Sequence, residues 1–182
     1  MNFVQPIRDP DTVRDIKEYF KQQNERDFIM FLLGVYLGRR ITDTLRLKVK
    51  DVRDKDYIRI WEQKTKKYIK LDINPELKQA LKHYCKDKAD NDYLIKSRKG
   101  KNRPIHRSTA YSIFKKAAKA FNLESIGTHS LRKTFGYHIY MNNNKDIALA
   151  QKALNHECEI DTIRYLGIDE QRVNKAVKSL KF

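Results

Sequence analysis

The chain has 182 residues, 40% of them hydrophobic and 34% charged, which suits one globular domain with a sizeable core. Lys and Arg number 39 against 23 Asp and Glu, a formal net charge of +16. This excess predicts a polyanionic partner, with nucleic acid ahead of an anionic membrane surface. The sequence has no signal peptide, no apolar run long enough to span a bilayer, and no basic helix with a bulky aromatic face. We therefore expect a cytoplasmic protein that binds nucleic acid and no membrane.

The two cysteines, Cys85 and Cys158, lie far apart without a secretory signal, which predicts free and reduced thiols. Each follows a histidine by two positions, His83 and His156 respectively. The cysteine spacing of a structural zinc site is missing, so we expect no metal here.

The first elements in chain order are predicted helices. Pro10 suits the start of one helix, and the polar residues 22–26 would connect it to the next. Residues 28–37 are apolar nearly all round, which predicts a central core helix that ends at Gly38. Arg40 would then lie at the end of this core helix. Taken alone, such an arginine is typical of a solvated surface.

The sequence changes period between residues 57 and 71, where β-branched and aromatic residues alternate with polar ones. Residues 57–61 and 67–71 read as two antiparallel strands joined by a turn that is rich in lysine. A turn of this kind is usually a solvated edge. It is also a way to hold Lys64, Lys66 and Lys67 over a DNA backbone.

A loop follows the next predicted helix, and residues 96–107 contain six Lys or Arg in twelve positions. A mobile charged loop and a phosphate-contacting loop explain this run equally well. The basic residues are Lys96, Arg98, Lys99, Lys101, Arg103 and Arg107. Ser108 is expected to cap the helix after the loop.

The last third of the chain places three polar clusters on an apolar, helical background. His129 and Arg132 are three residues apart, so they share one face of a helix that Thr128 can cap. An imidazole beside a guanidinium suits an anionic oxygen, because the guanidinium fork matches phosphate geometry. His156 follows, with Tyr165 nine residues later. Each feature alone is typical of a surface or core side chain, whereas all three at this spacing are rare by chance.

These stretches together resemble the tyrosine recombinase (phage integrase) family over roughly residues 10–170. The matches are GRRITD at 38–43 for the family's G-x-R-x-[ST]-[ED] box, the lysine of QKT at 63–65, HSLRKT at 129–134 for its HxLRxT box, and LNH at 154–156 for its LGH. Asn in place of Gly tolerates the left-handed backbone. The resemblance implies an α+β fold, mainly α-helical with a small antiparallel sheet, as in the tyrosine recombinase catalytic domain.

The resemblance also implies the chemistry. Its catalytic residues would be Arg40, Lys64, His129, Arg132, His156 and the nucleophile Tyr165. The tyrosine would form a 3′-phosphotyrosine with DNA, and resealing would need neither metal nor ATP nor any other cofactor. The arginines would clamp the phosphate, the lysine would protonate the leaving oxygen, and the histidines would assist. A type IB topoisomerase and a non-catalytic DNA-binding protein are the alternatives.

The family's usual N-terminal core-binding domain is absent from this sequence. We expect residues 1–182 to form a single catalytic domain, either one on its own or a minimal recombinase, which the initial Met favours. The tail at 168–182 has apolar residues at helical spacing and would dock on its own domain or, as the resemblance favours, on a neighbouring subunit. Double-stranded DNA is the expected partner, with a homotetramer on paired sites, a monomer without DNA, and a bacterial, phage or mobile-element origin.

Overall fold

The protein is represented by a computed structural model that describes all residues except 1–3, 124–125, 170–173, 175–176 and 181–182. Its described part is mainly helical with a two-stranded antiparallel sheet, which confirms the predicted α+β class. In chain order the elements are α1 (Pro10–Gln23), α2 (Glu25–Leu37), α3 (Ile41–Thr44), a 3₁₀ turn (Val49–Asp51), β1 (Tyr57–Glu62), β2 (Lys67–Asp72), α4 (Pro75–Cys85), α5 (Arg107–Ala120), α6 (Thr128–Asn142), α7 (Ile147–Leu154) and α8 (Glu159–Leu166).

Side-chain caps set most helix boundaries, and three predicted boundaries are wrong. Asn24 alone separates α1 from α2, because it ends the first helix in an extended conformation and accepts the Asp27 amide of the second. The cap of α5 is His106, whose ring accepts the amide of Ser108, so Ser108 is itself the donor. The residue before α6 is Gly127, and Thr128 already belongs to the helix.

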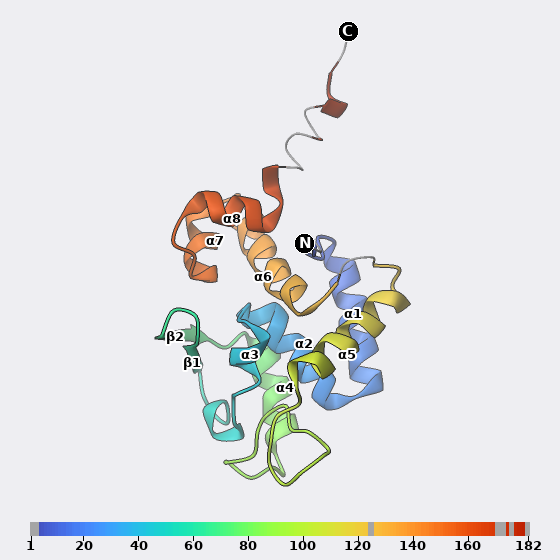
Figure 1. Ribbon diagram of the computed structural model, residues 1–182, viewed down its shortest axis with the longest axis vertical. Helices are drawn as coiled ribbons and strands as arrows, with labels where there is room; N and C mark the ends of the chain where they lie inside the picture. Colours follow the sequence, from blue (N-terminus) through green and yellow to red (C-terminus); the bar gives the residue numbers. More distant parts are fainter. Residues whose placement is uncertain (1–3, 124–125, 170–173, 175–176, 181–182) are drawn as a thin grey trace.

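Two hydrophobic clusters stabilise the described chain, and α6 belongs to both. The larger cluster surrounds α2, whose Leu32 and Leu33 are fully buried, and receives Leu131 from α6. The smaller one joins Tyr137 of α6 to apolar side chains of α7 and α8. Figure 1 shows α7 and α8 as an upper layer on α6, with the helices of the larger cluster below. Since α6 packs on both groups, it fixes residues of the two layers relative to each other.

Gly136 lies where α6 crosses α7 and α8. A Cβ added there would be 2.6 Å from Leu154 Cδ1 and 3.0 Å from Leu166 Cδ2. The absence of a side chain therefore allows the three helices to approach closely, which sets the height of α8 above α6.

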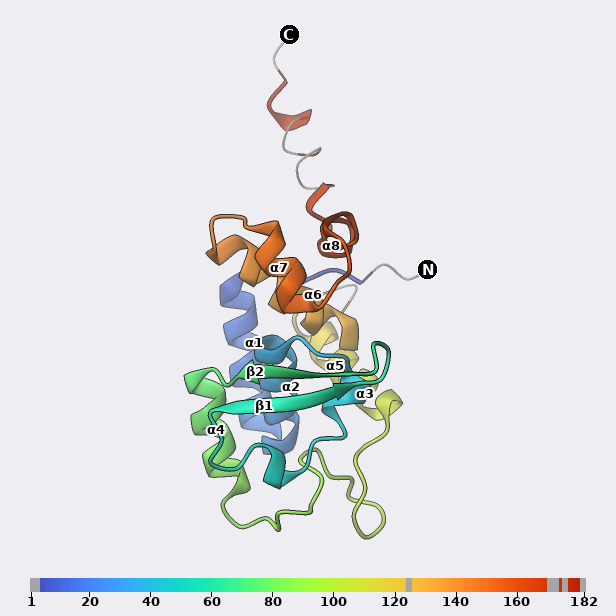
Figure 2. The same cartoon turned by 90° about the vertical axis from the view of Figure 1, so that its left-hand side faces the viewer.

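The hairpin forms an outer layer on the same side as α3 (Figure 2). In its register Ile60 pairs with Ile69 and Glu62 pairs with Lys67. Side chains of β1 alternate between exposed and buried, so Ile58, Ile60 and Glu62 all face the protein interior. The turn that contains Lys64 extends beyond this buried carboxylate.

Candidate active site

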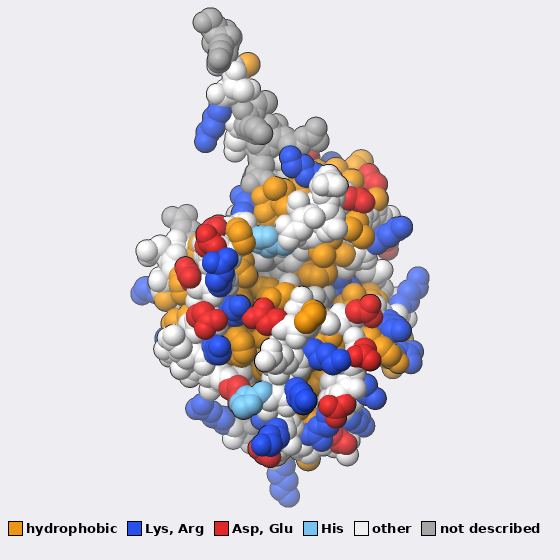
Figure 3. All heavy atoms as spheres, turned by 180° about the vertical axis from the view of Figure 1, so that it is seen from behind, with side chains coloured by type: hydrophobic (Ala, Val, Ile, Leu, Met, Phe, Trp, Pro, Cys, Tyr) orange, Lys and Arg blue, Asp and Glu red, His pale blue; other side chains and the backbone are white. Residues whose placement is uncertain are grey.

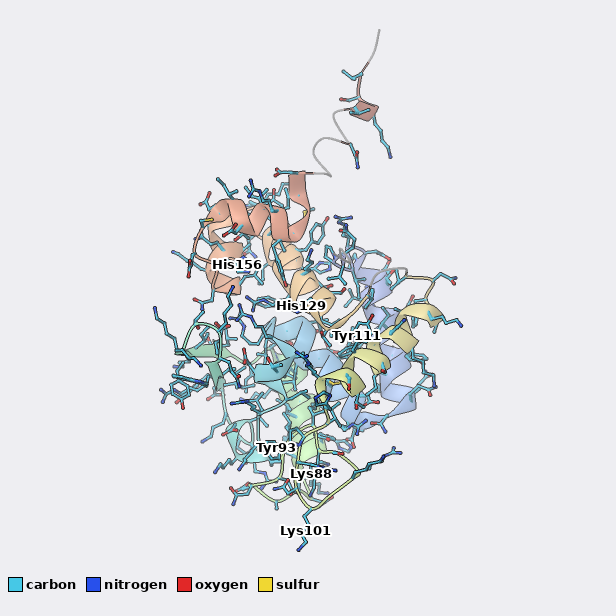
Figure 4. All side chains as sticks on the ribbon, viewed as in Figure 1. Lys88, Tyr93, Lys101, Tyr111, His129 and His156 are labelled. Atoms are coloured by element: carbon cyan, nitrogen blue, oxygen red, sulfur yellow. The ribbon has the colours of Figure 1, made fainter. Side chains whose placement is uncertain are left out.

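A pocket of about 380 Å³ brings all the predicted catalytic side chains together. They come from separate parts of the chain: the residue before α3, the hairpin turn, α6, the end of α7 and α8. Figure 4 shows His129 near the start of α6 and His156 in the connection between α7 and α8. The six are Arg40, Lys64, His129, Arg132, His156 and Tyr165. Residues up to 125 positions apart in sequence, such as Arg40 and Tyr165, thus line one cavity.

Two helix ends hold the Arg132 side chain, which is 3% exposed. Its Nη1 donates to the carbonyl of Gly38 at 2.7 Å, and its Nη2 donates to the carbonyl of Leu154. These carbonyls lie at the C-terminal ends of α2 and α7, where helices concentrate partial negative charge. Gly38 ends α2 in the left-handed conformation at φ 59°. The position of this guanidinium is therefore fixed by the backbone before any ligand binds.

Arg40 and Tyr165 each place an unpaired polar atom in the pocket. Arg40 Nη1 and the Tyr165 hydroxyl are buried, and neither has a hydrogen-bond partner among the described residues. Burial raises the pKa of Tyr165, while the nearby Arg132 charge opposes that rise. Buried polar groups are nearly always paired in proteins, and unpaired ones concentrate at functional sites. The pocket thus offers a cation and a hydroxyl, both without competing protein partners in the described chain.

Both histidines of the pocket are neutral at pH 7. Burial, with the charges of Arg132 and Arg40, lowers the pKa of His156 to about 4. Its ring stands perpendicular to that of Tyr165 with centroids 5.0 Å apart, and its Nδ1 lies 3.0 Å from Thr162 Oγ1. His129 is exposed within the pocket but partly surrounded by protein, and this partial burial and the same two arginines lower its pKa.

The backbone before His156 adopts the conformation predicted from the sequence. Asn155 ends α7 in the left-handed region at φ 52° and ψ 49°. Its side chain also donates to Glu62 Oε2 at 2.9 Å, which a glycine could not do. The asparagine therefore connects the end of α7 to the hairpin.

The lysines of the hairpin surround the open side of the pocket. Lys64 is exposed and lines the cavity. Lys66 and Lys67 are exposed beside it, and Lys66 adopts a left-handed conformation at φ 54°.

Most of the basic loop at residues 96–107 lies away from this pocket. Arg98, Lys99, Lys101 and Arg103 are exposed, and Figure 4 places Lys101 at the end of the molecule opposite His156. Lys96 pairs with Asp92 at 2.8 Å. Arg107 is different, since it lines a second pocket of about 500 Å³ together with Arg40, His129 and Arg132.

Two buried acids beside the pocket were missed as functional candidates. Glu62 was assigned to a solvated turn, and Asp43 only matched a motif, yet both side chains are buried. Asp43 Oδ1 accepts the amide of Gln63 at 3.4 Å, and burial raises the pKa of this carboxyl. Glu62 could have been found, because the two-residue period of β1 places it on the same face as Ile58 and Ile60.

The described residues contain no group of three His, Cys, Asp or Glu side chains arranged to hold a metal ion. Within the same residues, no helix has the length and apolar character needed to cross a membrane.

Comparison with known proteins identifies the family. The model of the phage integrase family matches residues 8–172. The chain belongs to the phage integrase family. It is 47% identical over 178 residues to the probable integrase/recombinase YoeC of Bacillus subtilis strain 168, which covers 98% of this chain and 97% of that protein. It is 26% identical over 161 residues to tyrosine recombinase XerA of Pyrococcus horikoshii, covering 87% of this chain and 56% of that protein.

Solved structures of this family share the fold. The crystal structure of XerA recombinase gives a TM-score of 0.75 at 22% identity and covers 98% of this chain and 67% of that one. XerH recombinase, bound to its difH substrate after cleavage, gives 0.75 at 21% identity and covers 97% and 53%. The predicted tyrosine recombinase catalytic-domain fold is therefore confirmed. The chain spans nearly all of YoeC but only about half of XerH.

Proposed function

We propose that this protein is a site-specific DNA recombinase that cleaves and rejoins DNA through a 3′-phosphotyrosine intermediate. The observation that carries the proposal is the pocket in which Tyr165 and Arg40 present unpaired polar atoms beside Arg132, Lys64 and two neutral histidines. The family and relatives named as integrases and recombinases support it.

The proposed chemistry needs only side chains of the pocket. The Tyr165 oxygen bonds to phosphorus while the bond to the 5′-oxygen breaks, and Lys64 protonates that leaving oxygen. Arg40 and Arg132 bind the non-bridging oxygens, whose negative charge grows in the transition state. His129 accepts the tyrosine proton, for which a neutral imidazole is required, and His156 hydrogen-bonds a phosphate oxygen. Reversal of the same steps reseals the strand, so the cycle consumes no ATP.

The proposed partner is double-stranded DNA. Titles of similar structures describe XerH bound to difH and λ integrase bound to a core site. The net charge of +16 supports a polyanion, and Figure 3 shows acidic side chains interspersed with basic ones on the face opposite the view of Figure 1. We propose phosphate contacts on the pocket side, by Lys66, Lys67 and Arg107, and along the basic loop, by Lys96, Arg98, Lys99, Lys101 and Arg103.

We further propose that residues 1–167 form the catalytic domain and that residues 168–182 dock on a neighbouring subunit of a homotetramer on paired sites. A λ integrase structure is described as a tetramer on a Holliday junction. Val177 and Leu180 of the predicted tail helix are exposed at 59% and 61%, which leaves apolar surface for a partner. Val173 and Phe182 lie outside the described residues.

The test is covalent trapping. The protein is mixed with a library of nicked DNA duplexes in EDTA without ATP, and adducts that resist SDS are collected and sequenced. We expect adducts that converge on one site sequence, which then supplies the substrate for later assays. If wild-type protein forms no adduct, the chain is a DNA-binding protein without this activity. Exchange between two copies of the site, compared with relaxation of one-site supercoiled DNA, separates a recombinase from a topoisomerase.

A further inference from the structure

Glu62 is the buried carboxylate beneath the proposed active site. It is the last residue of β1, and its side chain is 1% exposed. Burying a carboxylate is costly unless cations and hydrogen-bond donors surround it. The contacts of its two oxygens divide into two groups.

The first oxygen, Oε1, faces guanidinium groups. Arg39 Nη1 donates to it at 3.1 Å, and Arg132 Nη1 lies 4.0 Å away. Arg39 is itself buried, and it donates to the carbonyls of Leu37 and Ala153 near the ends of α2 and α7. This oxygen therefore belongs to the same arrangement of helix ends that holds Arg132.

The second oxygen, Oε2, faces the segments that carry three other pocket residues. Thr65 Oγ1 donates to it at 3.1 Å, directly beside Lys64 in the hairpin turn. Asn155 Nδ2 donates at 2.9 Å, directly before His156. Arg40 Nη1 lies 3.7 Å away. One carboxylate thus contacts or adjoins four of the six proposed catalytic positions.

Charge explains why a carboxylate is needed at this point. Arg39, Arg40 and Arg132 all lie within 4.0 Å of Glu62, and like charges at such distances in a partly buried site repel strongly. Burial, together with the charge of Arg132, lowers the pKa of Arg39 to about 10, and Glu62 opposes that fall. A neutral residue would leave the three cations uncompensated, and the two that face the pocket would move apart.

We propose that Glu62 is a positioning residue for DNA cleavage, which holds Arg40 and Arg132 at the spacing of the two non-bridging phosphate oxygens and fixes the hairpin turn and the His156 segment around them. This inference rests on the proposed function. It makes no direct contact with the DNA necessary, because Glu62 acts through the residues that it contacts.

The main test compares Glu62→Gln with Glu76→Gln. Glu76 is a matched control, since it also accepts from a cation and a hydroxyl, Lys17 and Tyr36, but lies outside the pocket. We expect both variants to bind the trapped site with dissociation constants within about threefold of wild type. Under single-turnover conditions with all DNA bound, Glu62→Gln should form adduct about 10²–10³-fold more slowly, the usual effect of losing one pre-organised electrostatic contact. Glu76→Gln should keep the wild-type rate.

A double-mutant cycle separates positioning from mere loss of fold. If Glu62 acts through Arg40, then Glu62→Gln should cost far less rate in an Arg40→Ala background than in wild type. Additive losses, or equal rates for Glu62→Gln and Glu76→Gln, would overturn the inference. If Glu62→Gln does not fold, the pair Thr65→Val with Asn155→Gly removes only the two neutral contacts to Oε2. That double variant should bind DNA normally and cleave at least tenfold more slowly, and an unchanged rate would overturn the inference as well.

The two proposals fail in different ways. An absence of adduct with wild-type protein contradicts the proposed function itself. Adduct formation by wild-type protein with an equal rate for Glu62→Gln contradicts only the role of Glu62.

Discussion

His156 links the electrostatics of the pocket to the stability of the fold. Its pKa is lowered to about 4 in the folded protein, from an ordinary value of 6.5. Between these values the unfolded chain binds a proton at this residue and the folded protein does not, so this contribution to stability is present above pH 6.5 and is lost as the pH falls towards 4. We expect the free energy of unfolding to fall less steeply over this range in His156→Gln than in wild type. Denaturant titrations at several pH values measure both slopes, and parallel slopes would contradict the lowered pKa.

Lys64 is predicted to act as the acid that protonates the leaving 5′-oxygen. Lys64→Ala should therefore slow cleavage by about 10²–10⁴-fold, the usual value for a positioned acid. A substrate with sulfur at the 5′-bridging position needs little protonation, so it should restore cleavage by Lys64→Ala but not by Arg132→Ala. Rescue of both variants, or of neither, would exclude Lys64 as the acid.

At the residue scale, the sequence predicted the side chains that face the substrate better than those behind them. The six catalytic candidates line one pocket because motif spacing follows the chemistry that they share. Glu62 and Arg39 were missed because their burial depends on how β1 packs against the ends of α2 and α7. Only the alternation along β1 hinted at it, since a carboxylate on the apolar face of a strand requires a buried cation.

At the element scale, the end of α7 determines where His156 lies. Asn155 has a positive φ, which costs an ordinary residue about 1 kcal/mol more than glycine. Both Asn155→Gly and Asn155→Ala lose the bond to Glu62, so their difference isolates the backbone. We expect Asn155→Ala to be less stable than Asn155→Gly by about 1 kcal/mol in denaturant unfolding. Equal stabilities would mean that the backbone relaxes and that the left-handed cap does not fix the His156 segment.

The order and type of the elements followed from hydrophobic period, and the boundaries did not. Strong periodic signals predicted α2 and the hairpin, whereas caps near residues 24, 106 and 127 depend on which side chain reaches a free amide. The close packing of α6 against α7 and α8 at Gly136 was not predictable either, because a single glycine in a helix gives no sign of what approaches it.

At the scale of the whole molecule, the basic loop tests how far the DNA-binding surface extends. Binding should weaken with salt by a log–log slope of about −0.9 for each phosphate neutralised. Changing Lys99 and Lys101 together to Gln should make that slope shallower by one to two such increments. The control changes Arg14 and Lys21 of α1 to Gln, which alters net charge equally. Equal slopes for the two double variants would mean that the loop at the far end of the molecule does not contact DNA.

The tail tests the proposed assembly. Deleting residues 169–182 should leave DNA binding intact but abolish strand exchange and the tetrameric complex on paired sites. The physical reason is that exposed apolar side chains such as Val177 and Leu180 would otherwise be covered by the neighbouring subunit. Gel-shift and two-site recombination assays measure the two properties separately. Full-rate recombination by the truncated protein would mean that the tail does not join subunits.

The central claim is that Tyr165 is the nucleophile, and peptide mapping of the trapped adduct tests it most directly. Tyr111 is the alternative that the structure offers, since it is 45% exposed and lines the adjoining pocket with Arg40 and Arg132. The adduct is digested with protease and nuclease, and the modified tyrosine is located by mass spectrometry. The account predicts a nucleotide attached to Tyr165, and no adduct from Tyr165→Phe despite normal DNA binding. Attachment at Tyr111 or at any other tyrosine, or adduct formation by Tyr165→Phe, would contradict it.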